Sequence, residues 1–344
     1  MKVLLYTKQL KVVSKSGVGR AIEMQLDSLR KAGVDITTDV NEDYETVHVN
    51  TIFPSDYFMA KKAKQKGKAV VYHAHSTKED FCNSFKGSNL IAPFFQKWIM
   101  KCYQLGDVIL TPTEYSKSLL EGYGIKKPII PISNGIDTQF YKKDLKKRKL
   151  FREHYNIDEN RKIIMSVGLY FDRKGILDFI ELAKRMPEYT FFWFGFTPYY
   201  QIPGNIKRAI EHSPSNLILP GYVSKEEIIM AYNGCDLFLF PSKEETEGIV
   251  VLEALAAQIP VLIRDIPVYS HWLKKEEDVY KASDIEEFQS LAKKILENKI
   301  KNLTLNGYQR AIERDSRLQA EKLKMIYERV GEDAKIYYGG GNNE

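Results

Sequence analysis

The sequence predicts an α/β protein made of two consecutive βαβ units, each built on a parallel sheet, with a cleft between them. Three observations predict this fold. Short apolar runs alternate with amphipathic helical patterns along most of the chain. A charge-dense segment, 142–152, interrupts the alternation, which then begins again. The length of 344 residues also suits two domains.

The first unit, residues 1–150, begins with an apolar run that is typical of a strand. A glycine-containing loop at 14–19 follows, and a helical pattern then extends from about Arg20 to Lys31. Gly33 suits the end of that helix, because glycine readily adopts the left-handed conformation of a helix C-cap. Strands are expected at 3–6, 46–49, 68–72, 108–111 and 128–132.

The second unit, residues 151–315, repeats the alternation of strand and helix patterns. From Asp284 onward the pattern is helical to about Glu332, and 316–337 is treated as a separate C-terminal helix. The glycine-rich end of the chain, 338–344, is expected to be flexible. Strands are expected at 163–167, 190–194, 217–219, 237–240 and 261–263.

The net charge of +6 is unevenly divided between the two units. Residues 1–150 contain 25 Lys and Arg against 15 Asp and Glu, a balance of +10, whereas residues 151–344 contain 26 against 30, a balance of −4. This asymmetry indicates an anionic partner surface for the first unit, and nucleic acid and anionic lipid are both candidates. No nucleic-acid-binding motif accompanies the charge, so we do not expect nucleic acid to be bound.

Three cysteines, Cys82, Cys102 and Cys235, form no CxxC pair and leave an odd thiol. We therefore expect a reducing, cytoplasmic environment and simple packing roles for the thiols. No apolar run reaches the roughly 18 residues that a membrane span needs. The apolar start at residues 1–6 is too short for a signal peptide.

The segment after the apolar run 237–240 has the most distinctive pattern of the chain. Glu245 and Glu253 are separated by seven residues, and Gly248 between them is expected to begin a helix. Glu253 then lies on an apolar helix face, where a carboxylate is costly without a partner, so we infer that an external polar ligand pairs with it. Glu244 and Glu247 are expected on a solvated face. The free N–H groups at the helix start form a site for an anion.

This segment resembles the E-x7-E motif of retaining glycosyltransferases of the GT4 type, which have the GT-B fold of two Rossmann-like domains facing a cleft. In its length and in the residues of its motifs, the chain also resembles bacterial synthases that glycosylate diacylglycerol or glucosyl-diacylglycerol. The resemblance implies that Glu245 contacts the transferred sugar near C3 or C4 and that Glu253 holds the ribose hydroxyls. Ile249 and Val250, after Gly248, would offer backbone N–H groups to the phosphates. The helix 316–337 would pack back on the first domain.

Two cations, Arg173 and Lys174, stand in the first turn of a helix that follows the strand 163–167. Cations at this end of a helix oppose its dipole, and a bound diphosphate would offset that. Lys174 matches the diphosphate-binding lysine of the resembling family. Many relatives have arginine directly after the strand glycine, where this chain has Leu169, and Arg173 is our candidate substitute.

Three further segments match the resembling family by position. Gly17 matches the glycine whose backbone approaches the donor diphosphate, where a side chain would block the approach. The segment Gly221, Tyr222 and Val223 resembles the lining of the nucleotide base pocket. Asn134 stands in a segment similar to N-G-[IV]-D-x3-F, and we expect it to shape the edge of the cleft.

Two histidines, His73 and His75, follow the strand 68–72. No Asp, Glu or Cys stands at a suitable spacing and we expect the two rings on opposite faces of the strand, so a metal site is not expected. The resemblance assigns His75 to hydrogen bonding of the donor sugar and positioning of the acceptor. His73 is expected to be a packed or surface residue.

Two segments of the first unit suit contact with an anionic membrane. Five lysines stand within residues 61–68, and aromatic residues with two lysines follow at 94–103. Basic helices with aromatic or aliphatic faces bind such surfaces, while a solvated helix and core packing are the alternatives. The candidate membrane or acceptor residues are Lys61, Lys62, Lys64, Lys66, Trp98 and Lys101.

The resemblance predicts a retaining hexosyltransferase that moves glucose or galactose from a UDP-sugar to diacylglycerol or monoglucosyl-diacylglycerol, on the inner face of the cell membrane. Its candidate catalytic residues are His75, Arg173, Lys174 and Glu245. The chain has no D-x-D triad, so neither a metal nor another cofactor is expected. Two alternatives stay open: a soluble or polymer-bound sugar acceptor, and a non-catalytic binding subunit, for which Leu169 leaves room.

Overall fold

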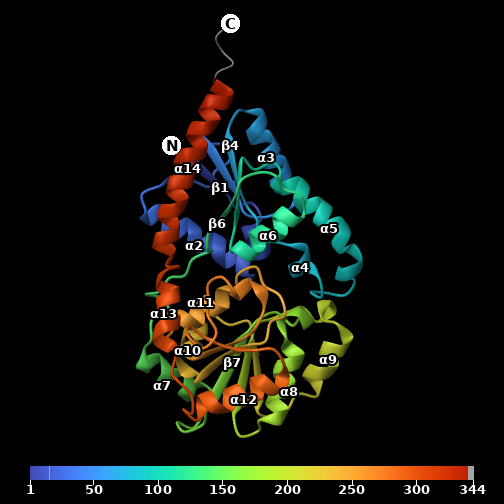
Figure 1. Ribbon diagram of the computed structural model, residues 1–344, viewed down its shortest axis with the longest axis vertical. Helices are drawn as coiled ribbons and strands as arrows, with labels where there is room; N and C mark the ends of the chain where they lie inside the picture. The colour runs from blue at the N-terminus through green and yellow to red at the C-terminus, as the bar shows by residue number, and fades with distance from the viewer. Residues whose placement is uncertain (15, 340–344) are drawn as a thin grey trace. The chain divides into compact units, whose positions relative to one another are not determined.

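The structure of the protein, a computed structural model, describes residues 1–14 and 16–339. The chain forms two compact units (Figure 1). The first comprises Met1–Lys78, Ile91–Asp137 and Arg314–Glu344, and the second Glu79–Leu90 and Thr138–Glu313. Each is built on a six-stranded parallel sheet, which confirms the predicted α/β fold class.

The first sheet changes direction between two of its central strands. From β1 (Lys2–Tyr6) the chain runs to a neighbour on one side, β2 (Asp35–Thr37), and then to a neighbour on the other side, β3 (Thr46–Val49). In an open parallel sheet, ligands bind at the carboxyl ends of the strands at such a switch point. Beyond β3 the order continues with β4 (Ala69–His73), β5 (Val108–Thr111) and β6 (Ile129–Pro131).

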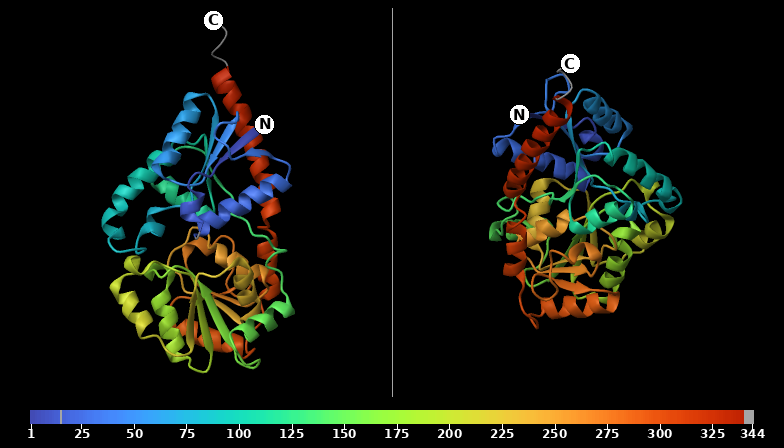
Figure 2. Two further views of the ribbon diagram at one scale, coloured as in Figure 1. Left: turned by 180° about the vertical axis from the view of Figure 1, so that it is seen from behind. Right: turned by 45° about the horizontal axis from the view of Figure 1, so that its top comes forward.

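Helices cover both faces of the first sheet (Figure 1 and Figure 2). On one face α2 (Gly17–Lys31) and α14 (Ser316–Gly339) lie side by side, so the C-terminal helix belongs to the core of the first unit. Residues 340–344 of the expected flexible end lie outside the described residues. The other face is covered by α3 (Pro54–Gln65), α5 (Ser88–Tyr103) and α6 (Glu114–Gly122), and the short helices are α1 (Leu10–Val13) and α4 (Lys78–Phe81).

The second sheet has its switch point between β7 (Ile163–Val167) and β10 (Leu237–Phe240). The order runs outward from β10 to β11 (Val261–Arg264) and β12 (Tyr280–Ala282), and outward from β7 to β8 (Thr190–Phe194) and β9 (Leu217–Gly221). Both orders leave the carboxyl ends of β7 and β10 adjacent. The helices are α7 (Leu145–His154), α8 (Ile176–Arg185), α9 (Gly204–Glu211), α10 (Lys225–Gly234), α11 (Ile249–Ala256), α12 (Ile285–Leu296) and α13 (Thr304–Ile312).

The structure adds one edge strand to each sheet that the apolar pattern did not predict. These strands, β2 and β12, have three residues each, and both contain a charged residue. A run this short carries little periodic signal. The charge-dense segment 142–152 proves to be mostly helical, because Asp144 caps α7 by accepting a hydrogen bond from the backbone of Lys146.

Candidate active site

The switch point of the second sheet brings together the two charged residues that the sequence analysis placed in separate motifs. Lys174 ends the 3₁₀ helix Asp172–Lys174 after β7, and Glu245 stands in the loop after β10. Because β7 and β10 are neighbours, their carboxyl ends meet. The Lys174 ammonium lies 2.5 Å from Oε1 of Glu245.

The environment of this ion pair holds Glu245 in its charged form. Burial alone would raise the pKa of Glu245, but the positive charges of Lys174 and Arg173 outweigh it and the pKa lies below its usual value. Ser242 adds a hydrogen bond to Oε1 at 2.7 Å. Burial lowers the pKa of Lys174, and the Glu245 charge acts against that shift. The site thus offers a carboxylate acceptor and a cation at one point.

Arg173, the neighbouring cation, is engaged within the second unit. Its guanidinium donates to Oδ1 of Asp80 at 2.8 Å and to Oγ of Ser84 at 3.1 Å. It also donates to the backbone carbonyl of Glu244 at 3.0 Å. Asp80 therefore offsets the charge of Arg173, and the guanidinium fastens the segment Glu79–Leu90 to the second unit. Sequence spacing gives no signal for a partner so far away along the chain.

Glu253 lies on α11 with only 1% of its surface exposed, as its apolar neighbours predicted. The inference that it needs an external partner is wrong. Tyr141 donates to Oε1 at 2.8 Å and Tyr232 donates to Oε2 at 2.6 Å. Glu247, expected on a solvated face, is also buried.

The helix start between the two glutamates is set by Gly248. Gly248 caps α11 in the left-handed conformation, with φ of 85°, so Ile249 and Val250 are its first residues. A Cβ atom added at Gly248 would lie 2.6 Å from the hydroxyl of Tyr269, so space and backbone both require glycine. Tyr269 is fully buried, its hydroxyl has no hydrogen-bond partner among the described atoms, and no sequence signal singled it out. The first N–H groups of a helix have no partner within the helix, so this helix end favours an anion.

The expected base-pocket segment lies at the carboxyl end of β9. Gly221 ends this strand with φ of 83°, and its carbonyl accepts a hydrogen bond from the backbone of Gly195 at 2.8 Å. Tyr222 is exposed and Val223 is half-buried. Gly17, in the first unit, begins α2 and has no atom within 4 Å of where its Cβ would stand, so the backbone there is open.

The two histidines of the first unit are buried against each other. The rings of His73 and His75 stack with centroids 4.1 Å apart, so the expectation of opposite faces is wrong, since residues two apart share a face of a strand. His73 is packed in the interior, as predicted. Burial lowers the pKa of His75 to about 3, which keeps its ring neutral at physiological pH. Among the described residues, no group of three or more His, Cys, Asp or Glu is arranged to hold a metal ion.

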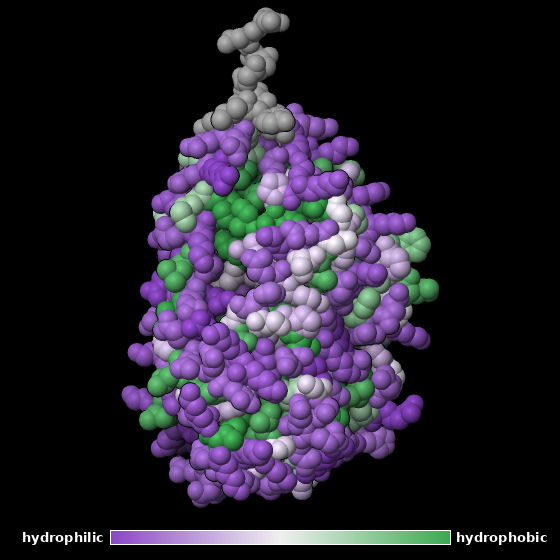
Figure 3. Space-filling view, viewed as in Figure 1, coloured by the Kyte–Doolittle hydropathy of each residue, from purple (hydrophilic) through white to green (hydrophobic). Residues whose placement is uncertain are grey.

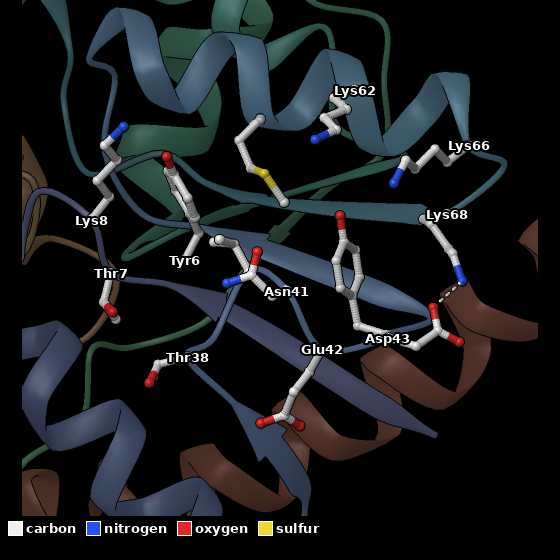
Figure 4. A pocket seen from close by; sticks show the side chains of 13 residues that line it. Tyr6, Thr7, Lys8, Thr38, Asn41, Glu42, Asp43, Lys62, Lys66 and Lys68 are labelled. Atoms are coloured by element: carbon white, nitrogen blue, oxygen red, sulfur yellow. Dashed lines mark hydrogen bonds and ion pairs between the residues drawn. The ribbon is translucent and has the colours of Figure 1, made fainter.

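The candidate membrane lysines divide into two groups. Lys62 and Lys66 line a cavity of about 530 Å³ together with Lys8 and Lys68, and their ammonium groups point into it (Figure 4). Lys64 instead forms an ion pair of 2.6 Å with Asp107. Lys61 and Lys101 are exposed on α3 and α5.

Trp98 contributes to the core of the first unit. Its indole N–H donates to the carbonyl of Ile52 at 2.7 Å, and its ring packs on Tyr57. The first half of α5 carries the exposed apolar side chains instead: Leu90 is 82% exposed and Phe94 is 71% exposed. Figure 3 shows hydrophobic residues at the surface in the region of α5. In the part of the chain that the structure describes, no helix combines the length and apolar character of a membrane span.

Comparisons with known proteins identify the family of the chain. A family model described as glycosyl transferases group 1 matches residues 147–313, and one described as glycosyltransferase family 4 matches residues 38–140. The chain is 42% identical over 331 residues to the processive diacylglycerol alpha-glucosyltransferase of Acholeplasma laidlawii, spanning 96% of this chain and 98% of that protein. It is 27% identical over 274 residues to the alpha-galactosylglucosyldiacylglycerol synthase of Streptococcus pneumoniae, spanning 75% and 71%.

Solved structures share the architecture. Sucrose-phosphate synthase from Thermosynechococcus elongatus matches with a TM-score of 0.81 and 15% identity, over 96% of this chain and 99% of that one. HepE from Anabaena, solved with UDP-glucose, matches with a TM-score of 0.75 and 15% identity, over 96% and 100%. At this identity the likeness establishes the fold.

Proposed function

The chain belongs to the family-4 glycosyltransferases with the GT-B fold, and from this premise we propose that it transfers glucose from UDP-glucose to a diacylglycerol lipid. The names of its relatives support a glycolipid product, and the relative with 42% identity is a glucosyltransferase. We extend the proposal to both acceptors, diacylglycerol and monoglucosyl-diacylglycerol, because that relative is named as processive.

One observation carries the proposal within the second unit. The Lys174–Glu245 ion pair and the Gly248 helix start both follow strands at the switch point of the sheet. A nucleoside diphosphate sugar needs positive charge for its phosphates and acceptors for its hydroxyls. Lys174 and the N–H groups at the start of α11 supply the first, and Glu245 with Glu253 supplies the second.

The proposed reaction breaks the bond between C1 of glucose and the β-phosphate oxygen and joins C1 to the acceptor oxygen. Negative charge grows on the leaving diphosphate, and Lys174 with the backbone of Ile249 and Val250 stabilises it. The α configuration is retained, and the leaving phosphate oxygen takes the acceptor proton. No protein nucleophile and no divalent metal take part.

The remaining assignments follow the same scheme. Arg173 acts through its charge, which helps to lower the pKa of Glu245. His75 hydrogen-bonds the sugar as a neutral ring. The backbone of Gly17 faces the diphosphate, and the segment Gly221–Val223 contacts the uracil.

The acceptor reaches the enzyme from an anionic membrane. We assign membrane contact to the exposed apolar side chain of Phe94 on α5, with Lys101 on the same helix and Lys61 on α3. Apolar side chains together with lysines suit a membrane, which has a hydrocarbon core and an anionic headgroup surface. The enzyme would then work as a peripheral protein on the inner face of the cell membrane.

The test is a transfer assay with purified protein and vesicles. UDP-glucose, UDP-galactose or GDP-mannose is offered with vesicles that contain diacylglycerol or monoglucosyl-diacylglycerol, in buffer with EDTA, and the product linkage is read by NMR. We expect an α-glucosyl lipid from UDP-glucose. Galactose transfer, a β linkage, transfer to soluble sugars only, or abolition by EDTA would each contradict a named part of the proposal.

Two variants connect the assay to the site. Lys174→Met is expected to lower kcat/KM about 100-fold, because it removes charge where the leaving group develops its own. Lys243→Met is the matched control: Lys243 also forms an ion pair with a residue after β7, Asp172, but on the surface. Equal loss in both variants would mean that the Lys174 site has no special role.

A further inference from the structure

A chain of hydrogen bonds runs through the interior of the first unit and ends at His75. Nε2 of His75 lies 2.9 Å from Oδ1 of Asn50, which follows β3. Nδ2 of Asn50 donates to Oε1 of Gln25 on α2 at 3.0 Å. Nε2 of Gln25 lies 3.5 Å from Nδ1 of His73. All four side chains are buried, with at most 8% of any one exposed.

The two amides give this chain a direction. An amide donates from its nitrogen and accepts at its oxygen. Because the Asn50 nitrogen faces the Gln25 oxygen, the Asn50 oxygen is left for His75 and the Gln25 nitrogen is left for His73. Nε2 of His75 must therefore carry hydrogen, and Nδ1 of His73 must not.

We propose that Gln25 and Asn50 are positioning residues that fix the tautomer of His75, with hydrogen on Nε2 and a bare Nδ1. The tautomer proposal rests on the proposed function only for the hydrogen bond between His75 and the donor sugar. The hydrogen bond to Asn50 uses Nε2, so Nδ1 is the ring nitrogen of His75 left for a ligand.

The consequence is a specific polarity for recognition. A neutral imidazole with a bare Nδ1 accepts a hydrogen bond and donates none there, so it selects a ligand hydroxyl that donates. Both histidine rings stay neutral because burial disfavours the imidazolium. The two amides thus determine which of the two neutral tautomers of His75 a sugar would contact.

Long-range ¹H–¹⁵N NMR of histidine-labelled full-length protein tests the inference without any activity. Signals are assigned with His73→Gln and His75→Gln. We expect the wild-type His75 signal to show hydrogen on Nε2. Gln25→Met, which leaves the Asn50 amide free to rotate, is expected to convert His75 to a mixture of both tautomers, although Gln25 does not touch it.

Two more variants make the pattern decisive. Gln25→Glu is nearly isosteric, and its carboxylate accepts at both ends, so His73 should move its hydrogen to Nδ1 while His75 keeps Nε2–H. Tyr327→Phe is the matched control, because Tyr327 bonds to Nδ1 of His48 in the same core but stands outside the amide chain. It should leave His75 unchanged. Hydrogen on Nδ1 of wild-type His75, or an unchanged His75 in Gln25→Met, would overturn the inference.

The vesicle assay adds a functional readout. Gln25→Met is expected to lower kcat/KM for UDP-glucose about tenfold, the effect of one poorly aligned hydrogen bond, and Tyr327→Phe much less. The two failures are distinguishable. If no lipid is glucosylated but the NMR pattern holds, the proposed function fails alone. If glucose is transferred and the tautomer does not respond to Gln25, the inference fails alone.

Discussion

At the scale of single residues, the two units bury their charged groups in opposite ways. The second unit buries a charged pair, Lys174 and Glu245, whereas the first buries three neutral rings, His48, His73 and His75. Charges taken out of water are stable only while both partners are present. Buried imidazoles are stable only while they stay unprotonated. Each arrangement therefore has its own test.

Lys174→Met is expected to lower the free energy of unfolding by about 3–5 kcal/mol at neutral pH, because Glu245 stays buried and loses the cation with the largest effect on it, although Arg173 remains. Without Lys174, burial raises the pKa of Glu245, so the penalty should shrink as pH falls and the carboxylate takes up a proton. Urea unfolding at pH 7 and pH 5 measures both effects. In Lys174→Met/Glu245→Gln, part of the loss should be recovered.

The exposed pair Lys243–Asp172 supplies the control for this cycle. Lys243→Met is expected to change the free energy of unfolding by no more than about 1 kcal/mol, because a surface pair is solvated and screened. If Lys174→Met is equally mild at neutral pH, the buried pair is not held as an ion pair.

The histidines predict a loss of stability in acid. Burial lowers the pKa of His48 and of His75 from 6.5 to about 3. Between these pH values the unfolded chain binds more protons than the folded one, so the free energy of unfolding falls as pH decreases. Each ring contributes up to about 1.4 kcal/mol per pH unit. His48→Asn should reduce the slope of the free energy of unfolding between pH 6 and pH 4.5 by about that amount, and urea unfolding at several pH values measures it.

At the scale of elements, α7 shows how one carboxylate holds a highly charged helix in place. Asp236 precedes β10 and accepts hydrogen bonds from Arg148 at 2.9 Å and from Arg152 at 3.0 Å. It also accepts one from the backbone of Ile163 at the start of β7. The charge-dense segment that interrupts the alternation of strand and helix patterns is thus fixed to the second sheet.

Asp236→Ala is expected to lower the free energy of unfolding by about 3–5 kcal/mol, because Arg152 is only 5% exposed and loses its counter-charge. The exposed Lys149–Glu153 pair on the same helix gives the comparison, and Glu153→Ala should cost no more than about 0.5 kcal/mol. Denaturant unfolding of both variants measures the difference. Similar losses would mean that α7 is held by its apolar contacts instead.

At the scale of the whole molecule, the last segment of the chain completes the first unit. Leu323 and Tyr327 of α14 pack with Val3, Val71 and Leu110 from three strands of the first sheet. The first unit therefore has no complete core until the chain has passed through the second. Each unit nevertheless has its own hydrophobic core.

Leu323→Ala is expected to destabilise the first unit by about 2–5 kcal/mol through the cavity it leaves. Met325→Ala, at a position 60% exposed on the same helix, should have little effect. Because UDP is proposed to bind the second unit, it should still raise the unfolding temperature of that unit in Leu323→Ala. Calorimetry with and without UDP would show this, and loss of the UDP response would mean that the units do not unfold independently.

Local pattern was enough to predict most of the framework. The strands 46–49, 108–111, 163–167, 190–194 and 237–240 match the structure at both ends. All five strands are buried, and all except 46–49 are mostly apolar runs, a signal carried by consecutive residues. The left-handed Gly248 at a helix start belongs to the same class, because a turn of this kind is decided by a few neighbouring residues.

The partners of the site residues could not be predicted in this way. Asp80 beside Arg173, the two tyrosines on Glu253, and Gln25 behind Asn50 stand far from them along the chain. Each pair joins different elements of the fold, and only the packing of those elements brings its members together. The sequence alone therefore determined the fold class and the charged motifs, through local propensity. Only the tertiary structure decided which buried polar groups pair, because the partners lie far apart along the chain and meet only when the elements pack.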